Sequence, residues 1–201
     1  MRKFVFFGDS ITEIVGVTHL TKGFVFKIEK KLKCVTFNYG VSGSRISITR
    51  PLSQQRPGLS FLDRLSDLPL DADKVIVFGG TNDFGQPSAC PLGKEGEKTP
   101  KTFWGATRIL LETLLKNYKK EALLFILPLP RRETIHHIPN DLGFYLEDYM
   151  DILRKQCEKY GVKYVDYFKN FSKIWKYSND LLHPNNKGNT LLTKLLIKEL
   201  K

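Results

Sequence analysis

Hydrophobic residues along this chain gather in short runs that are separated by longer polar or amphipathic stretches. Five runs stand out, several of them rich in Val, Ile or Phe: Lys3–Phe7, Val35–Tyr39, Val75–Phe78, Leu123–Leu127 and Lys163–Val165. Continuous apolar runs of this length are typical of strands that are buried on both faces of a parallel sheet. The pattern therefore predicts five parallel strands.

Helical periodicity fills the stretches between these runs. Its segments are Phe24–Leu32, a short one near Leu59–Leu65, Thr102–Tyr118, Phe144–Tyr160 and Lys187–Leu200. Strands that alternate with helices predict a doubly wound α/β fold, with helices on both faces of the sheet. The chain has 201 residues and contains no internal repeat, low-complexity tract or linker-like stretch. We therefore expect one domain over residues 1–201.

Unusual polar residues follow the predicted strands. They form four segments: Gly8-Asp9-Ser10, Gly40-Val41-Ser42-Gly43, Gly79-Gly80-Thr81-Asn82-Asp83 and Asp180-Leu181-Leu182-His183. The carboxyl ends of parallel strands share one edge of the sheet, which is where open α/β sheets bind ligands. A hydroxyl, a glycine that exposes its backbone, a carboxamide and an acid–imidazole pair are the groups that acyl transfer requires.

These segments resemble, in order and spacing, the four sequence blocks of the GDSL-type, or SGNH, esterases and lipases. The resemblance extends over nearly the whole chain and implies a flavodoxin-like fold, a three-layer α/β/α sandwich. It implies that Ser10 is the nucleophile and that Asp180 and His183 complete a catalytic triad. It also implies an oxyanion hole made by the backbone N–H groups of Ser10 and Gly43 and the side chain of Asn82. Ile11 stands where the name-giving motif often has Leu, and we interpret it as a packing position.

The chemistry of the residues supports the same roles. A serine hydroxyl is a poor nucleophile until an imidazole removes its proton, and a carboxylate must orient that imidazole and stabilise its charged form. Asp180 and His183 are three positions apart, so a single turn would let the carboxylate reach Nδ1 and leave Nε2 for Ser10. Gly43 lets the backbone approach a carbonyl oxygen, and Asn82 can donate to it. No cofactor is required.

Structural interpretations remain open for several of these residues. Asp9 and Ser10 could form a capping turn, Asn82 and Asp83 a simple turn pair, and His183 could be a structural histidine. Ser42 is a rival nucleophile because Gly40-Val41-Ser42-Gly43-Ser44 approaches the GxSxG pattern of larger α/β hydrolases. Its fifth position is Ser and not Gly, so this pattern fails.

The remaining histidines and the longest irregular stretch suggest no second site. His136 and His137 fall in the loop between Pro128 and Pro139, where we expect them to be solvated, with a pocket-lining role as the alternative. His19 has no triad-like neighbour, and no cluster of His and acidic residues predicts a metal site. The irregular segment Phe84–Lys101 is too long for a plain connection, and we expect a loop over a site.

Charge, cysteine content and the N-terminus set limits on partners and location. The 32 Lys and Arg exceed the 21 Asp and Glu, but 14 of them lie in residues 1–100 and 18 in residues 101–201, so we expect a generally basic surface and no specific nucleic-acid site. The three cysteines, Cys34, Cys90 and Cys157, form neither a disulfide framework nor a zinc pattern. Only four apolar residues precede the polar Gly8-Asp9-Ser10, too few for a signal peptide, and no run approaches the roughly 20 residues of a membrane span. These features predict a soluble cytoplasmic protein.

The substrate is the least determined property. The segment Phe84–Lys101 is polar and charged and no apolar lid is visible, which favours a small water-soluble ester, with an O-acetylated carbohydrate as the first candidate. The same triad could serve an acyltransferase, a thioesterase or a lysophospholipase. A catalytically inactive carbohydrate-binding module is the alternative outside the enzymes, with Arg45, Arg50 and Arg56 as its binding residues.

Overall fold

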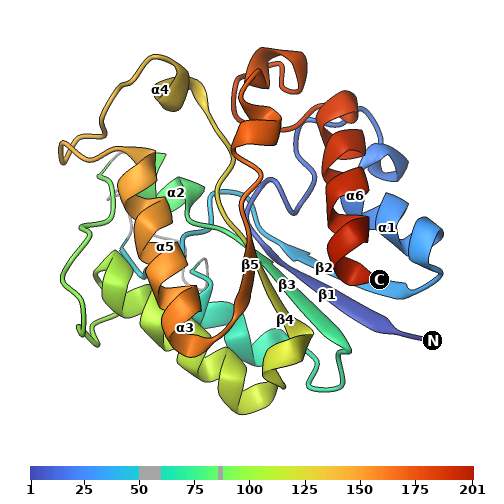
Figure 1. Ribbon diagram of the computed structural model, residues 1–201, viewed down its shortest axis with the longest axis horizontal. Coiled ribbons are helices and arrows are strands. Elements are labelled where there is room, and N and C mark those ends of the chain that lie inside the picture. Colours follow the sequence, from blue (N-terminus) through green and yellow to red (C-terminus); the bar gives the residue numbers. More distant parts are fainter. Residues whose placement is uncertain (50–59, 86–87) are drawn as a thin grey trace.

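A single parallel sheet forms the centre of the molecule (Figure 1). The computed structural model describes residues 1–49, 60–85 and 88–201. Within them the strand order is β2-β1-β3-β4-β5, and every neighbouring pair is parallel. The strands are β1 (Lys3–Gly8), β2 (Val35–Gly40), β3 (Lys74–Phe78), β4 (Leu123–Ile126) and β5 (Lys163–Val165). All five strands match the predicted runs, and their order is that of flavodoxin-like folds.

Helices cover both faces of the sheet, so the predicted three-layer α/β/α sandwich is confirmed (Figure 1). The helices α1 and α6 pack together on one face, and α3 and α5 pack together on the other. The helices are α1 (Phe24–Leu32), α2 (Thr81–Gly85), α3 (Phe103–Asn117), α4 (Arg132–Ile135), α5 (Leu146–Tyr160) and α6 (Asn186–Leu200). Single 3₁₀ turns lie at Leu20–Lys22, Leu62–Asp67, Lys120–Ala122, Lys169–Phe171 and Ile174–Lys176. No helix of the described residues is long and apolar enough to span a bilayer.

The apolar run of β1 supplies both hydrophobic layers. Side chains alternate across a strand, so Val5 and Phe7 enter the layer beneath α3 and α5, whereas Phe4 and Phe6 enter the layer beneath α1 and α6. All four side chains are almost completely buried. Burial of a side chain of this size contributes on the order of 1.5–3 kcal/mol, which explains why Phe4–Phe7 contains no polar residue.

The short helix expected near Leu59–Leu65 forms as a 3₁₀ turn over Leu62–Asp67, while Leu59 lies outside the described residues. The turn ends at Leu68, which has extended dihedral angles and directly precedes Pro69. A proline disfavours helical backbone at the residue before it, so this segment cannot continue as an α-helix.

The strand order reverses between β1 and β3, which is the position where open α/β sheets bind ligands. Gly8, the last residue of β1, pairs with Gly40 of β2 on one side and Phe78 of β3 on the other. The segments that follow these three strands therefore start side by side. A Cβ atom on Gly40 would lie 2.1 Å from the backbone nitrogen of Glu13, so only glycine lets the chain after β1 pass this closely.

Candidate active site

Ser10 lies in a tight turn that directly follows β1. The Asp9 carboxylate accepts a hydrogen bond of 2.9 Å from the Ile11 backbone N–H, and the Ser10 carbonyl accepts one of 3.0 Å from Val15. This pattern is an Asx turn that starts a short helical segment. It holds the Ser10 side chain at the switch point of the sheet, with 6% of the residue exposed.

His183 connects Ser10 with Asp180 through two hydrogen bonds. Its Nε2 lies 2.9 Å from Ser10 Oγ, and its Nδ1 lies 2.6 Å from Asp180 Oδ2. The structure thus brings together three residues that the sequence separates by up to 173 positions. An imidazole placed between a hydroxyl and a carboxylate is the arrangement that activates a serine nucleophile.

The loop that carries Asp180 and His183 is fixed by its own hydrogen bonds. Asp180 Oδ1 accepts from the backbone N–H of His183 at 2.8 Å, from that of Leu182 at 3.0 Å and from the Ser178 hydroxyl at 2.9 Å. Leu181 turns the chain with a φ of 61°, so the segment is a loop and not a helix. Partial burial alone would raise the pKa of Asp180, but the hydrogen bonds from His183, Ser178 and Leu182 hold it well below its ordinary value. Asp180 is therefore a carboxylate over the whole physiological range.

The segments that follow β2 and β3 are bonded to one another beside this turn. Gly43 has a φ of 75°, a conformation that favours glycine, and the Ser44 N–H closes the turn onto the Val41 carbonyl at 3.2 Å. Asn82, in the first turn of α2, donates from Nδ2 to the Ser44 carbonyl at 3.0 Å. The predicted oxyanion-hole residues Gly43 and Asn82 therefore belong to two turns joined by a side-chain hydrogen bond.

Three charged side chains that the sequence analysis gave no role hold these turns in place. Arg64 donates to the Gly8 carbonyl at 3.1 Å and to the Ser44 hydroxyl at 2.7 Å. The Asp83 carboxylate accepts the backbone N–H groups of residues 46 and 47, at 2.9 and 3.0 Å. Glu13 accepts both the backbone N–H, at 2.6 Å, and the hydroxyl of Ser42. The turns after β1, β2 and β3 thus form one hydrogen-bonded unit.

Asp9 is completely buried next to Ser10. Its Oδ2 has no hydrogen-bond partner among the described residues. Burial, aided by the charge of Asp83, raises the pKa of Asp9 and outweighs the bond from Ile11 and the charges of Arg64 and Arg131, which lower it, so that its pKa is about 7. Asp9 therefore titrates near neutral pH.

Ser42 and the other histidines make no triad-like contacts among the described residues. The exposed Ser42 is bonded to Glu13 and not to a histidine. His136 and His137 are exposed, and His137 stacks on Tyr145 with a ring separation of 4.4 Å. His19 is exposed and caps the 3₁₀ turn at Leu20–Lys22. No group of metal-ligating side chains occurs in residues 1–49, 60–85 and 88–201.

Arg45, one of the candidate residues of a carbohydrate-binding module, is buried in the structure. Arg45 is 4% exposed and donates to the carbonyls of Thr49 and Ser88, at 3.1 and 3.0 Å. Arg50 and Arg56 lie outside the described residues. Arg45 thus has a structural role in joining two loops. The three cysteines, Cys34, Cys90 and Cys157, are all buried thiols.

The segment Phe84–Lys101 has two parts. Phe84 and Gly85 end α2 and, with Ser88, line a hollow of about 580 Å³ whose other wall is formed by residues 133 and 138–141. The later part packs against the start of α3, where the N–H groups of Phe103 and Trp104 donate to the carbonyls of residues 91 and 92. The first part therefore borders a hollow, and the later part is held against α3.

Comparison with known proteins agrees with this fold. Residues 6–191 match the model of the GDSL-like lipase/acylhydrolase family. The chain belongs to this family of hydrolases. No match was found among curated protein sequences.

Solved structures of GDSL-like and related proteins superpose over almost the full length of the chain. A protein from Lactobacillus plantarum has 28% identity and a TM-score of 0.84, with 99% of this chain and 96% of that chain covered. A lipase/acylhydrolase from Enterococcus faecalis has 20% identity and a TM-score of 0.70, with 100% and 95% covered. An acetyl xylan esterase has 20% identity and a TM-score of 0.69, with 99% and 100% covered. The last two likenesses show the GDSL-like fold alone.

We predict that Asp9 makes the stability of the protein depend on pH. Its folded-state pKa of about 7 lies above the ordinary value of 3.8, so its contribution is complete below about pH 4 and is lost as the pH rises toward 7. In urea unfolding between pH 4 and 8, the free energy of unfolding should fall by up to about 1.4 kcal/mol per pH unit through this group. Asp9→Asn should flatten this slope.

The exposed carboxyl Asp73 provides the matched control, and Asp73→Asn should retain the slope of the wild-type protein. The buried Asp83, whose pKa burial also raises, keeps part of the slope in Asp9→Asn. An unchanged pH profile in Asp9→Asn would contradict a neutral Asp9 in the fold.

Proposed function

We propose that this protein is a serine esterase that hydrolyses small acyl esters through an acyl-enzyme intermediate on Ser10. The observation that carries the proposal is the hydrogen-bonded series of Ser10 Oγ, the His183 imidazole and the Asp180 carboxylate, with separations of 2.9 and 2.6 Å. Both contacts lie within the range in which a base can take a proton from a nucleophile.

In the first half of the reaction, Ser10 Oγ attacks the ester carbonyl while His183 Nε2 takes the hydroxyl proton. Asp180, an anion with four hydrogen-bond donors, fixes the proton of the ring on Nδ1 and stabilises the imidazolium. The tetrahedral intermediate then expels the alcohol, which receives the proton from Nε2. This leaves the acyl group on Ser10.

In the second half, a water molecule replaces the alcohol. His183 takes a proton from the water as its oxygen attacks the acyl-enzyme, and the proton returns to Ser10 Oγ when the carboxylic acid leaves. An alcohol or an amine could replace water in this step, so an acyltransferase differs from an esterase only in the acceptor. No step needs a metal ion or an organic cofactor.

The negative charge of both tetrahedral intermediates requires donors on the opposite side of the carbonyl. We assign these donors to the backbone N–H groups of Ser10 and Gly43 and to the amide of Asn82. Two observations support the assignment: Asn82 is anchored to the Ser44 carbonyl next to Gly43, and Arg64 anchors Ser44 to the end of β1. Donors held in advance stabilise the transition state without reorganisation.

An O-acetylated carbohydrate is our first candidate for the substrate. The exposed segment 94–98 of the loop before α3 carries Lys and Glu side chains, which favours a water-soluble substrate over a lipid. An acetyl xylan esterase is also among the proteins with the same fold. A thioesterase or lysophospholipase with the same triad is the alternative.

We expect a fluorophosphonate probe to label Ser10 stoichiometrically, because only a hydroxyl beside a base reacts rapidly with such probes. Intact mass and peptide mapping identify the labelled residue. His183→Ala should lose nearly all labelling and turnover, and Asp180→Asn should lose much of both because the imidazole tautomer is no longer fixed. Ser42→Ala, the exposed serine nearby, should keep both, and label on Ser42 would refute the assignment.

Asn82→Ala should lower kcat by about 10²–10³ and leave KM almost unchanged, since the oxyanion forms only in the transition state. Steady-state kinetics on a nitrophenyl ester measure the two constants. Asn38→Ala is the matched control, because the Asn38 amide also donates to a backbone carbonyl near Ser10, that of Thr12 at 2.8 Å, but has no proposed contact with substrate. If the two folded variants lost activity to the same extent, Asn82 would have only a structural role.

Activity on nitrophenyl esters should be highest for acetyl to butyryl groups and should fall as the acyl chain lengthens. A graded series of these esters, with acyl thioesters and acetylated sugars beside it, measures the preference. A maximum at decanoyl or longer chains would instead favour a lysophospholipase.

A further inference from the structure

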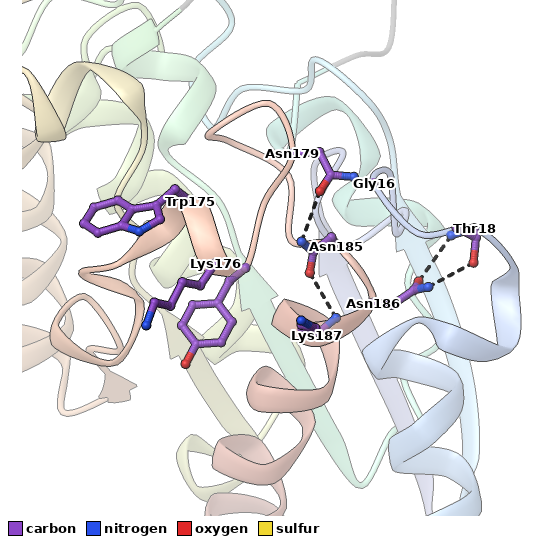
Figure 2. A pocket seen from close by; sticks show the side chains of 9 residues that line it. Gly16, Thr18, Trp175, Lys176, Asn179, Asn185, Asn186 and Lys187 are labelled. Atoms are coloured by element: carbon purple, nitrogen blue, oxygen red, sulfur yellow. Dashed lines mark hydrogen bonds between the residues drawn. The ribbon is translucent and has the colours of Figure 1, made fainter.

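A hollow lies beside the loop that carries Asp180 and His183 (Figure 2). Its volume is about 770 Å³, and its walls include Trp175, Lys176, Asn179 and Lys187. A second hollow of about 520 Å³ shares Asn186 and Lys187 with the first and adds Lys22 and Lys27. We call the two hollows together the lysine channel.

Trp175 gives the lysine channel a flat apolar surface. It lies in the 3₁₀ turn Ile174–Lys176, where the Ile174 side chain is fully buried in the core and Trp175 points outward with 55% of its surface exposed. An indole of this exposure offers one face to a ligand. The C–H face of a sugar ring is apolar and flat, while its hydroxyl groups remain available for hydrogen bonds, so a sugar unit matches this surface.

Positive charge is the second property of the lysine channel. Four lysines line the channel: Lys22, Lys27, Lys176 and Lys187. Among the described residues, none of these lysines forms an ion pair, and no Asp or Glu lines either hollow. Partial burial lowers the pKa of Lys27, and the charge of Lys22 lowers it further. The repulsion between like charges would be relieved by an anionic ligand.

The amide side chains of Asn179, Asn185 and Asn186 form a rigid wall of the lysine channel. Asn186 donates to the Thr18 hydroxyl at 3.0 Å and accepts from its backbone N–H at 3.3 Å. Asn185 donates to Asn179 at 3.2 Å and accepts from the Lys187 backbone N–H at 3.0 Å (Figure 2). These contacts fix the wall before a ligand binds, which lowers the entropic cost of binding.

We propose that the lysine channel binds an anionic saccharide, a chain of sugar units that carry carboxylate or phosphate groups. One sugar unit stacks on Trp175, and the acidic groups contact the lysines. A single-stranded nucleic acid is the less suitable occupant, because such sites stack successive bases on several aromatic side chains. Trp175 and Tyr177 are the aromatic residues among the described walls, and the Tyr177 ring packs edge-on against Phe171.

The lysine channel adjoins the proposed catalytic residues. Asn179 directly precedes Asp180, and a Cβ atom on Gly16, another wall residue, would lie 2.9 Å from the Cβ of His183. A saccharide chain bound here lies next to the loop that bears the triad. Resting on the proposed esterase function, we infer that the channel holds an acidic glycan while Ser10 removes an acyl group from it.

Binding can be tested without turnover in the Ser10→Ala protein. Calorimetry and the fluorescence of Trp175, measured against the buried Trp104, report binding of oligogalacturonate and of a phosphorylated oligomannose, with xylo-oligosaccharides of equal length as the neutral comparison. At least one anionic chain should bind at least tenfold more tightly than the neutral one, and its affinity should fall as salt is added. The two acidic probes distinguish carboxylate from phosphate recognition.

Variants locate the binding surface. Trp175→Ala and the double variant Lys176→Ala/Lys187→Ala should each weaken binding by tenfold or more. The double variant Lys155→Ala/Lys159→Ala removes the same charge from exposed positions on α5, on the opposite face of the sheet, and should leave binding unchanged. In the protein with Ser10 intact, Trp175→Ala should leave turnover of nitrophenyl acetate unchanged but raise KM for an acetylated acidic glycan.

Three results would overturn the inference: binding of neither acidic probe, equal loss in the α5 control, or tighter binding of oligouridylate through Trp175, which would indicate a nucleic-acid site. The outcome is separable from that of the proposed function. Saccharide binding with no esterase activity would refute the esterase alone, whereas esterase activity without saccharide binding would refute the lysine channel alone.

Discussion

The position of β1 is the constraint on which the rest of the structure depends. This strand is buried on both faces, and it pairs on one edge with β2 and on the other with β3. Its alternating side chains hold both helical layers, so its end is fixed within the sheet from all sides. The segment after Gly8 therefore starts from a fixed position, and Ser10 lies two residues further along the chain. One Asx turn is enough to hold Ser10 at this point.

The candidate site also requires that the turns after different strands keep fixed positions relative to one another. Buried charges meet it here, because Arg64 and Asp83 bond to backbone groups of the turns after β1 and β2. Backbone groups in tight turns cannot all pair with each other, and an unpaired buried polar group is costly. The cost of burying these charges is visible in the pKa of Arg64, which burial lowers, and in that of Asp83, which burial raises. The site is thus held by groups that are themselves strained electrostatically.

The sequence predicted the strands, the main helices and the candidate residues because these signals are local. Apolar runs mark the strands, and Asp180 and His183 are separated by a single turn. Arg64, Glu13 and Asp83 could not be predicted as supports, since their roles depend on backbone groups that lie far away in the sequence. The left-handed conformation of Leu181 could not be predicted from the sequence either, because leucine rarely adopts a positive φ. The structure makes the loop there by bonding Asp180 to several donors at once.

The distribution of charge likewise differs between the sequence and the folded structure. Lysines and arginines are spread along both halves of the chain, which favoured an evenly basic surface. In the fold, Lys22 and Lys27 from the first helical region meet Lys187 at the start of α6, because α1 and α6 pack side by side on one face. The loop before α6 adds Lys176 and the exposed ring of Trp175. The same packing of α1 against α6 that buries the apolar layer of β1 therefore also brings together cations from opposite ends of the chain, near the loop that carries Asp180 and His183.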